Sequence, residues 1–156
     1  MSQQQHEYIL PGARQICLVC KDLDKTLETL SNVLEIRPWR KYDVVWGKDE
    51  MQVGNPQTIK AAFADFGAVE MEVVQPIKGD SVWARQLEAK GEGVHHIAVD
   101  VQSIEQTAAR LAEKGVGIVQ WGWKGPLGHA FLDPEKTGGV YFELLQRRGR
   151  LAPKRG

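Results

Sequence analysis

The chain lacks the features that mark membrane-spanning, secreted and nucleic-acid-binding proteins. None of its apolar runs approaches the roughly 18 residues that cross a bilayer, and residues 1–12 lack the basic and then apolar pattern of a secretory signal. Its 20 Lys and Arg balance 20 Asp and Glu, so the overall charge does not suggest a surface that binds a polyanion. The one basic run, in residues 147–155, is typical of a solvated chain end. We therefore expect a cytoplasmic protein with no membrane and no nucleic-acid partner.

Cysteine is nearly absent. The two that occur, Cys17 and Cys20, have the spacing of a redox or zinc motif. They lie in a β-like apolar run, however, in which residues three apart point to opposite faces. We therefore expect neither a disulfide nor a shared metal ion between them, and we interpret both as small strand residues.

The sequence contains an internal duplication. Residues 15–26 align without a gap on residues 96–107, and residues 69–75 align on residues 140–146. Each half therefore opens and closes with a matching segment, which is the pattern of two copies of one supersecondary unit.

Each half is predicted to fold as β-α-β-β-β. The opening strand is followed by a helix with its N-cap at Asp22 or Ser103 and apolar residues at helical spacing, and three β-like segments complete the half. The predicted fold class is α+β, with two βαβββ modules. The expected divisions are an N-terminal extension (1–13), a first module (14–76), a connector that contains a helix (77–94), a second module (95–147) and a basic tail (148–156).

Strand alternation decides which side chains can meet, because residues two apart share a face. Apolar residues at alternate positions form the face that the helices cover. The opposite face carries Gln15 and His96 at equivalent positions of the opening strands, and Glu72 and Glu143 at equivalent positions of the closing strands. His95, one position away, should face the helices, and we interpret it as structural.

Packing of the halves about a pseudo-twofold axis would bring these four side chains into one groove. A single Glu in a strand is usually a solvated edge residue, and a lone His is usually structural. Ligand-type residues at both pairs of equivalent positions favour a metal site instead. Three oxygens and one imidazole nitrogen suit one divalent ion per chain, such as Mn, Co, Ni, Zn or Mg, whose charge would offset the two carboxylates.

Two segments around these ligands carry a family resemblance. Residues 91–101 read GEGVHHIAVDV, and residues 131–144 read FLDPEKTGGVYFEL. Here the chain resembles the vicinal oxygen chelate (glyoxalase/bleomycin-resistance/dioxygenase) superfamily, and most of all its methylmalonyl-CoA epimerase-like branch. The resemblance implies that the two βαβββ modules form a cupped mixed sheet around one metal site, with a small-molecule substrate and a homodimer. It also implies that the ion stabilises the enolate-like charge that develops when a proton leaves a carbon beside a carbonyl.

Two departures from the epimerase pattern bear on the chemistry. Gln15 stands where the epimerases usually have His, although Gln occurs there in some glyoxalase I enzymes. Gln57 stands where the resemblance places a second catalytic Glu, and an amide cannot take a proton at neutral pH. The resemblance places the base of the family at the position of Glu143, which is the residue expected to move the proton. An isomerase, an epimerase and a lyase acting on a carbonyl, carboxylate or acyl-CoA substrate all stay open.

Substrate-binding candidates are Gln57, Trp123 and His129. For any single Trp, core packing is the commoner role. The alternative to an enzyme is a non-catalytic small-molecule (drug-like) binding protein, since relatives of this fold sequester drugs without a metal. The four ligand-type residues favour the enzyme.

Overall fold

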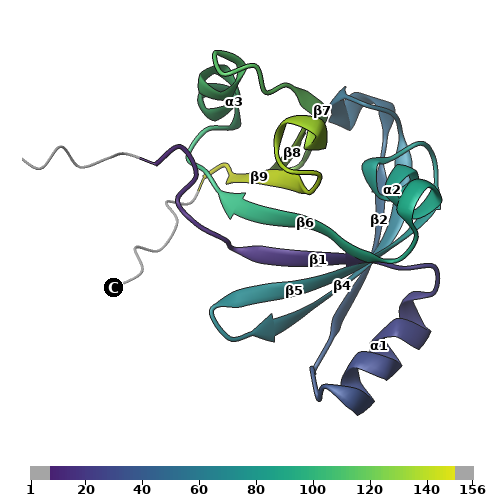
Figure 1. The fold of residues 1–156 in the computed structure, drawn as a ribbon. Coiled ribbons are helices and arrows are strands. Elements are labelled where there is room, and N and C mark those ends of the chain that lie inside the picture. The colour runs from purple at the N-terminus through teal and green to yellow at the C-terminus, as the bar shows by residue number, and fades with distance from the viewer. Residues whose placement is uncertain (1–7, 150–156) are drawn as a thin grey trace, which may run out of the picture.

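The structure is a computed structural model that describes residues 8–149. Its strands form one curved, nearly closed sheet with the order β2-β4-β5-β1-β6-β9-β8-β7-β3 (Figure 1). Lys124 helps to close the sheet, because its Nζ donates to the main-chain oxygen of Val45 at 2.6 Å. The strands are β1 (Gln15–Val19), β2 (Arg40–Trp46), β3 (Met51–Val53), β4 (Gln57–Phe66), β5 (Val69–Lys78), β6 (Gly93–Asp100), β7 (Ile118–Lys124), β8 (Leu127–Leu132) and β9 (Tyr141–Arg147).

The duplication predicted from the sequence is present in the strand pairing. In the first half β1 runs parallel to β5 with Gln15 opposite Glu70, and in the second half β6 runs parallel to β9 with His96 opposite Tyr141. The two halves join where β1 pairs antiparallel with β6. The α+β class and the paired modules are therefore confirmed. The short strand β3 was not predicted: it leaves the first half and pairs with β7 of the second.

The α-helices of residues 8–149 lie on two different sides of the sheet: α1 (Leu23–Val33), α2 (Val82–Lys90) and α3 (Ile104–Ala112). The predicted N-caps are confirmed, since the side chains of Asp22 and Ser103 accept main-chain hydrogen bonds at the starts of α1 and α3. Helix α1 packs on Cys20, Ala62 and Val73, and helix α3 packs on Val99, Ala130 and Leu144. The face of the sheet on which these residues lie is what we call the outer face.

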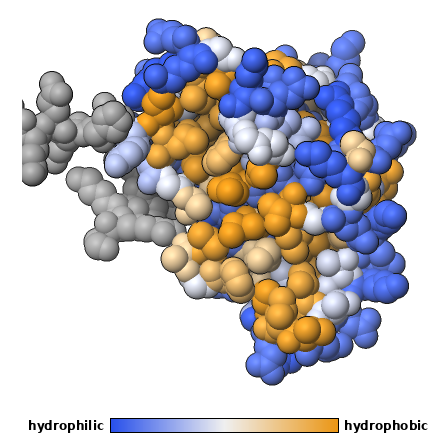
Figure 2. Space-filling model, in the orientation of Figure 1, coloured by the Kyte–Doolittle hydropathy of each residue, from blue (hydrophilic) through white to orange (hydrophobic). Residues whose placement is uncertain are grey.

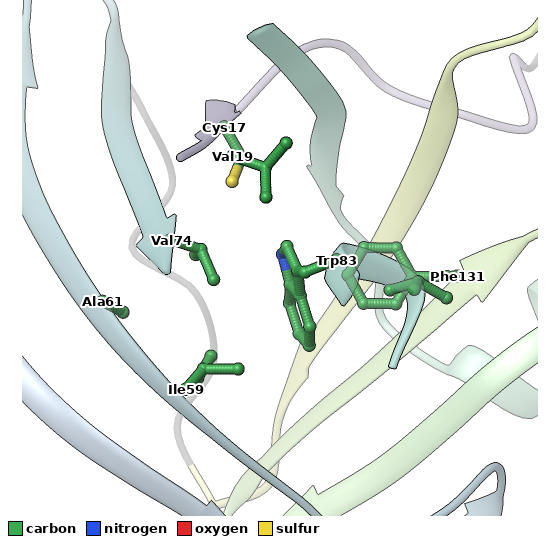
Figure 3. Close-up of a cluster of buried hydrophobic side chains, with 8 residues drawn as sticks. Cys17, Val19, Ile59, Ala61, Val74, Trp83 and Phe131 are labelled. Carbon is green, nitrogen blue, oxygen red and sulfur yellow. The ribbon is translucent and has the colours of Figure 1, made fainter. Parts of the chain in front are cut away.

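The connecting helix α2 packs on the opposite, inner face. Its Val82 and Trp83 join a buried cluster with Cys17, Val74 and Phe131, which Figure 3 shows around the Trp83 ring. The predicted connector is shorter than expected, because β5 continues to Lys78 and β6 begins at Gly93.

Residues 1–7 of the predicted extension and residues 150–156 of the predicted basic tail lie outside the described residues. Among the helices of residues 8–149, none has the length and apolar character that crossing a membrane requires.

Candidate metal centre

The four predicted ligands meet on the inner face, one from each of the strands β1, β5, β6 and β9. His96 Nε2 lies 3.2 Å from Gln15 Oε1, 3.2 Å from Glu72 Oε2 and 3.0 Å from Glu143 Oε2. All four are buried: the exposed fraction is 0% for His96 and 5–7% for Gln15, Glu72 and Glu143. The structure therefore brings together every residue of the predicted ligand set.

Strand pairing explains this convergence. Glu72 lies opposite Cys17, two residues along β1 from Gln15, and Glu143 lies opposite Ala98, two residues along β6 from His96. The antiparallel pairing of β1 with β6 then sets Cys17 opposite His96 and Ala98 opposite Gln15. Small residues thus separate the ligands in each strand, which leaves room for the long side chains to meet between them.

The charge of the cluster is unbalanced without a cation. Two buried carboxylates face one imidazole, so even a protonated His96 cannot neutralise both. Burial raises the pKa of Glu143, against the opposing effect of His96. Burial lowers the pKa of His96, but the Cys17 and Glu143 side chains beside it outweigh burial and hold that pKa well above its usual value. Burying such a net negative charge is costly, and a divalent ion removes the cost.

The donor set fits such an ion. Two ligands about 2.1 Å from one ion and at right angles to each other lie about 3.0 Å apart. The distances of 3.0–3.2 Å from His96 Nε2 to the three oxygens agree with that spacing. Glu72, His96 and Glu143 can each point a ligand atom at one ion, and Gln15 adds a neutral oxygen.

Strand alternation predicted that His95 faces the helices of the outer face. This prediction is wrong. The register of β6 against β1 shifts between His96 and Val94, which leaves His95 as the extra residue of a β-bulge. Its ring therefore turns to the inner face, where it stacks between Trp83 of α2 at 5.7 Å and Tyr141 of β9 at 4.8 Å. It is fully buried, and its Nδ1 lies 2.9 Å from Nδ1 of His96.

Cys17, His95 and His96 form a second group with metal-ligand atoms close together. The Nδ1–Nδ1 distance of 2.9 Å between the two imidazoles is an ordinary hydrogen-bond length. Burial also raises the pKa of the Cys17 thiol far above its usual value, which disfavours the thiolate that a metal needs. We therefore interpret this group as a hydrogen-bonded support for His96.

Comparison with known proteins identifies the family. The model of the Glyoxalase/Bleomycin resistance protein/Dioxygenase superfamily matches residues 14–132. The chain belongs to this superfamily. It is 32% identical over 96 residues to the uncharacterized protein YqjC of Bacillus subtilis, covering 60% of this chain and 69% of that protein. It is 33% identical over 104 residues to the mitochondrial methylmalonyl-CoA epimerase of Bos taurus, where the match spans 61% of this chain and 59% of the relative's length.

Solved structures of the superfamily share the fold. Methylmalonyl-CoA epimerase from Mycobacterium tuberculosis has a TM-score of 0.69 and 23% identity, covering 96% of this chain and 95% of that one. A variant of the Streptomyces coelicolor methylmalonyl-CoA epimerase, in complex with 2-nitronate-propionyl-CoA, has a TM-score of 0.70 and 24% identity, covering 92% of this chain and 99% of that one. The resemblance inferred from the sequence and the cupped α+β fold are therefore confirmed.

The predicted substrate-binding residues fall on different faces of this superfamily fold. Gln57 lies in β4 opposite Trp46, buried at 3% exposure, and neither end of its amide has a hydrogen-bond partner within residues 8–149. His129 is also buried on the inner side, with its ring 4.4 Å from the ring of Trp46. Trp123 is not near them: it packs on the outer face with the α3 cluster, and Arg148 lies over its ring at 3.6 Å.

Aromatic side chains fill the space beside the ligand cluster. Phe131 packs against His96 at 5.0 Å and against Trp83 at 5.2 Å between ring centroids, and both aromatic residues are buried. Two surface pockets of about 490 and 280 Å³ lie elsewhere, and none of the four ligands lines either of them. The buried side chains that could hold a metal ion lie in the ligand cluster and not in these pockets.

Two neighbours of the ligands were not predicted from the sequence. Glu70 accepts a hydrogen bond from Gln15 Nε2 at 2.9 Å, and Tyr141 holds the ring of His95. Both occupy the position two residues before a ligand Glu in a closing strand. The same alternation that identified the ligands places these side chains on the inner face, so the signal was present in the sequence.

Proposed function

We propose that this chain is a divalent-metal-dependent isomerase, epimerase or lyase that moves a proton on a carbon beside a carbonyl group. The observation that supports the proposal is the meeting of Gln15, Glu72, His96 and Glu143 at 3.0–3.2 Å in a buried site. When bound, a divalent ion supplies a Lewis acid that stabilises negative charge on the substrate oxygen. The names of the relatives point to an acyl-CoA as one substrate class.

Glu143 is the residue we assign to proton transfer. Its pKa is raised by burial, which brings a carboxyl group closer to the range in which it can both take and return a proton near neutral pH. Glu72 we assign as a ligand only. The site then has one base rather than two, because Gln57 is an amide.

Gln57 and His129 are the residues we assign to substrate binding. A buried amide with both ends unpaired costs free energy. A substrate oxygen would accept from its nitrogen, and a hydroxyl group or a water molecule would donate to its oxygen. His129 Nε2 lies 3.3 Å from the amide nitrogen of Gln120, so the ring accepts at Nε2 and has its N–H at Nδ1. Trp123 has no part in this proposal, since it lies on the outer face.

The outer face supports the proposal of a homodimer. Ile16 of β1 lies opposite Ile97 of β6 at the junction of the modules, and both side chains are only half-buried. Figure 2 shows hydrophobic side chains gathered on the side of the molecule where the central strands of Figure 1 face the viewer. A second copy that covers this face would remove the apolar surface from water.

Solvent-deuterium incorporation tests the proposed chemistry. The wild type is incubated in D₂O with its divalent ion and with 2-methylmalonyl-CoA or a 2-hydroxycarbonyl compound, and exchange at the α-carbon is followed by NMR. Glu143→Gln keeps a ligand oxygen but removes the base and binds the ion more weakly. At a metal concentration that saturates the variant, exchange should fall by about 10²–10⁴-fold. Glu113→Gln, an exposed position after α3, is the matched control and should exchange like the wild type.

Two results would contradict the proposal. Exchange by Glu143→Gln at the wild-type rate would remove Glu143 as the base. Absence of exchange by the metal-loaded wild type with every substrate of both classes would instead favour a non-catalytic binding protein.

A further inference from the structure

The ligands of the candidate centre are of two kinds. Glu72 and Glu143 end in carboxylates, whose two oxygens are equivalent, so either can face a cation. Gln15 ends in an amide, of which only the oxygen is a metal ligand, and the nitrogen end would repel a cation with its hydrogens. A neighbouring side chain must therefore fix which end of the Gln15 amide faces the cluster.

Glu70 is that neighbouring side chain. It lies directly opposite Gln15 in the parallel pair of β1 and β5. Gln15 Nε2 donates to Glu70 Oε1 at 2.9 Å, and Gln15 Oε1 lies 3.2 Å from His96 Nε2. An ionised carboxylate can only accept hydrogen bonds, so the nitrogen end of Gln15 must turn to Glu70 and the oxygen end must turn to the cluster.

Two arginines hold Glu70 in this role. Arg40 donates to Glu70 Oε2 at 3.1 Å, and Arg14 approaches Glu70 Oε1 at 3.9 Å. The Glu70 side chain is only 19% exposed, so these cations compensate a carboxylate that is mostly withdrawn from water. Guanidinium groups only donate, which keeps both oxygens of Glu70 as acceptors.

In the second module the equivalent ligand has different neighbours. His96 is the equivalent of Gln15, and the residue opposite it is Tyr141 rather than an acid. Tyr141 stacks on His95, and His95 Nδ1 contacts His96 Nδ1 at 2.9 Å. The acid therefore appears only in the module whose opening strand has an amide ligand, which ties Glu70 to Gln15 rather than to the fold as a whole.

We propose that Glu70 is a positioning residue that keeps the oxygen of the Gln15 amide directed at the bound cation. This inference rests on the proposed metal site and deepens it.

The substitution Glu70→Gln tests the proposal because it changes one oxygen into an amide nitrogen at nearly constant volume. Arg40, which contacts the Glu70 oxygen that faces away from Gln15, would hold the oxygen of the new amide. The amide nitrogen would then face Gln15 and turn the Gln15 oxygen away from the cluster. Affinity for Co²⁺ or Mn²⁺, measured by calorimetry with the metal alone, should fall about 10–100-fold. The matched control is Asp65→Asn, which also removes a carboxylate from Arg40 but has no hydrogen bond to Gln15 among the described residues.

The double variant Gln15→Glu with Glu70→Gln replaces the ligand that needs orientation by one that does not. It keeps the total charge, and the residue 15 carboxylate has two equivalent oxygens that need no orientation. The amide at position 70 can donate to one of them while the other faces the ion. We therefore expect the double variant to regain the metal affinity lost in Glu70→Gln, which a general loss of structure would not allow.

The NMR signals of the Gln15 side-chain amide in metal-free protein provide a readout that does not depend on metal. They should shift in Glu70→Gln and stay in place in Asp65→Asn. If the wild type binds no divalent ion, the proposed function fails, whereas unchanged Gln15 signals in Glu70→Gln would overturn the role of Glu70 itself. Wild-type metal affinity in Glu70→Gln, or no recovery in the double variant, would also overturn it.

Discussion

Replacing the buried His129 should make the stability of this protein less sensitive to acid. His129 is 4% exposed, its Nε2 lies 3.3 Å from the Gln120 amide nitrogen, and its ring packs edge-on against Trp46. Burial, with a smaller effect of His96, lowers the pKa of His129 from 6.5 to about 3. In the unfolded chain the same imidazole has a pKa of about 6.5. As the pH falls below that value, the unfolded state binds a proton that the native state does not, and the free energy of unfolding decreases.

The size of the effect follows from this difference in pKa. At pH 8 both states are neutral at His129, so the contribution is close to zero. At pH 5 the unfolded imidazole is almost fully protonated and the native one is not, which costs the native state about 2 kcal/mol. His129→Gln abolishes the titration, although it also lowers stability at every pH because it disturbs the contact with Gln120. The stability difference between wild type and variant should therefore narrow by about 2 kcal/mol from pH 8 to pH 5.

Urea unfolding of metal-free protein between pH 5 and pH 8 measures this difference. Ile59→Val is the matched control, because it removes a methylene from the same inner cluster and titrates nothing. Its stability difference from the wild type should be about 0.5–1.5 kcal/mol at every pH. A wild-type to His129→Gln difference that stays constant over this range would mean that native His129 takes up its proton normally, contrary to the effect expected from its burial.

Three further predictions concern the core, the thiols and the assembly. Trp83→Ala should lower the free energy of unfolding by about 3–5 kcal/mol, because Trp83 is 3% exposed and contacts both His95 and Phe131. A loss below about 1 kcal/mol in denaturant titration would contradict its role in the inner cluster. Cys17 and Cys20 are free and buried, so a thiol reagent should react slowly with native protein and with two thiols per chain in denaturant; fast reaction of the native protein would contradict their burial. Light scattering at micromolar concentration should give the mass of a homodimer, and a strictly monomeric mass would remove the proposed role of the outer face.

The ligand set could be predicted from the sequence because duplication and strand alternation act together. One copy alone gives a Glu in a strand, which is usually a solvated residue. The second copy places Glu143 where the first has Glu72, and His96 where the first has Gln15, and the pairing of β1 with β6 brings both copies together. The period of two residues then fixes the face, so the order of residues alone is enough to assign the four side chains to one side of the sheet.

His95 was assigned to the wrong face because alternation fails at a β-bulge. The extra residue is defined by the partner strand, where Leu18 pairs with Val94 and Cys17 with His96, and no local pattern in residues 91–101 announces it. The orientation of the side chains of β7 could not be predicted for a different reason, since apolar or aromatic residues occupy both faces of this strand. Trp121 and Trp123 point outward there, while Gln120 points inward to His129, and only the packing of α3 decides between these faces.

The metal content of the purified chain shows whether Gln15, Glu72, His96 and Glu143 hold an ion. Wild type and His96→Ala are incubated with an excess of Mn²⁺, Co²⁺, Ni²⁺ or Zn²⁺, dialysed, and analysed by elemental mass spectrometry, with circular dichroism to show that both are folded. The imidazole of His96 is the donor nearest to all three oxygens, at 3.0–3.2 Å, so its removal should abolish tight binding. We expect close to one divalent ion per wild-type chain and none in folded His96→Ala. A wild type that retains no ion, or a His96→Ala variant that retains a full equivalent, would contradict the proposed metal site.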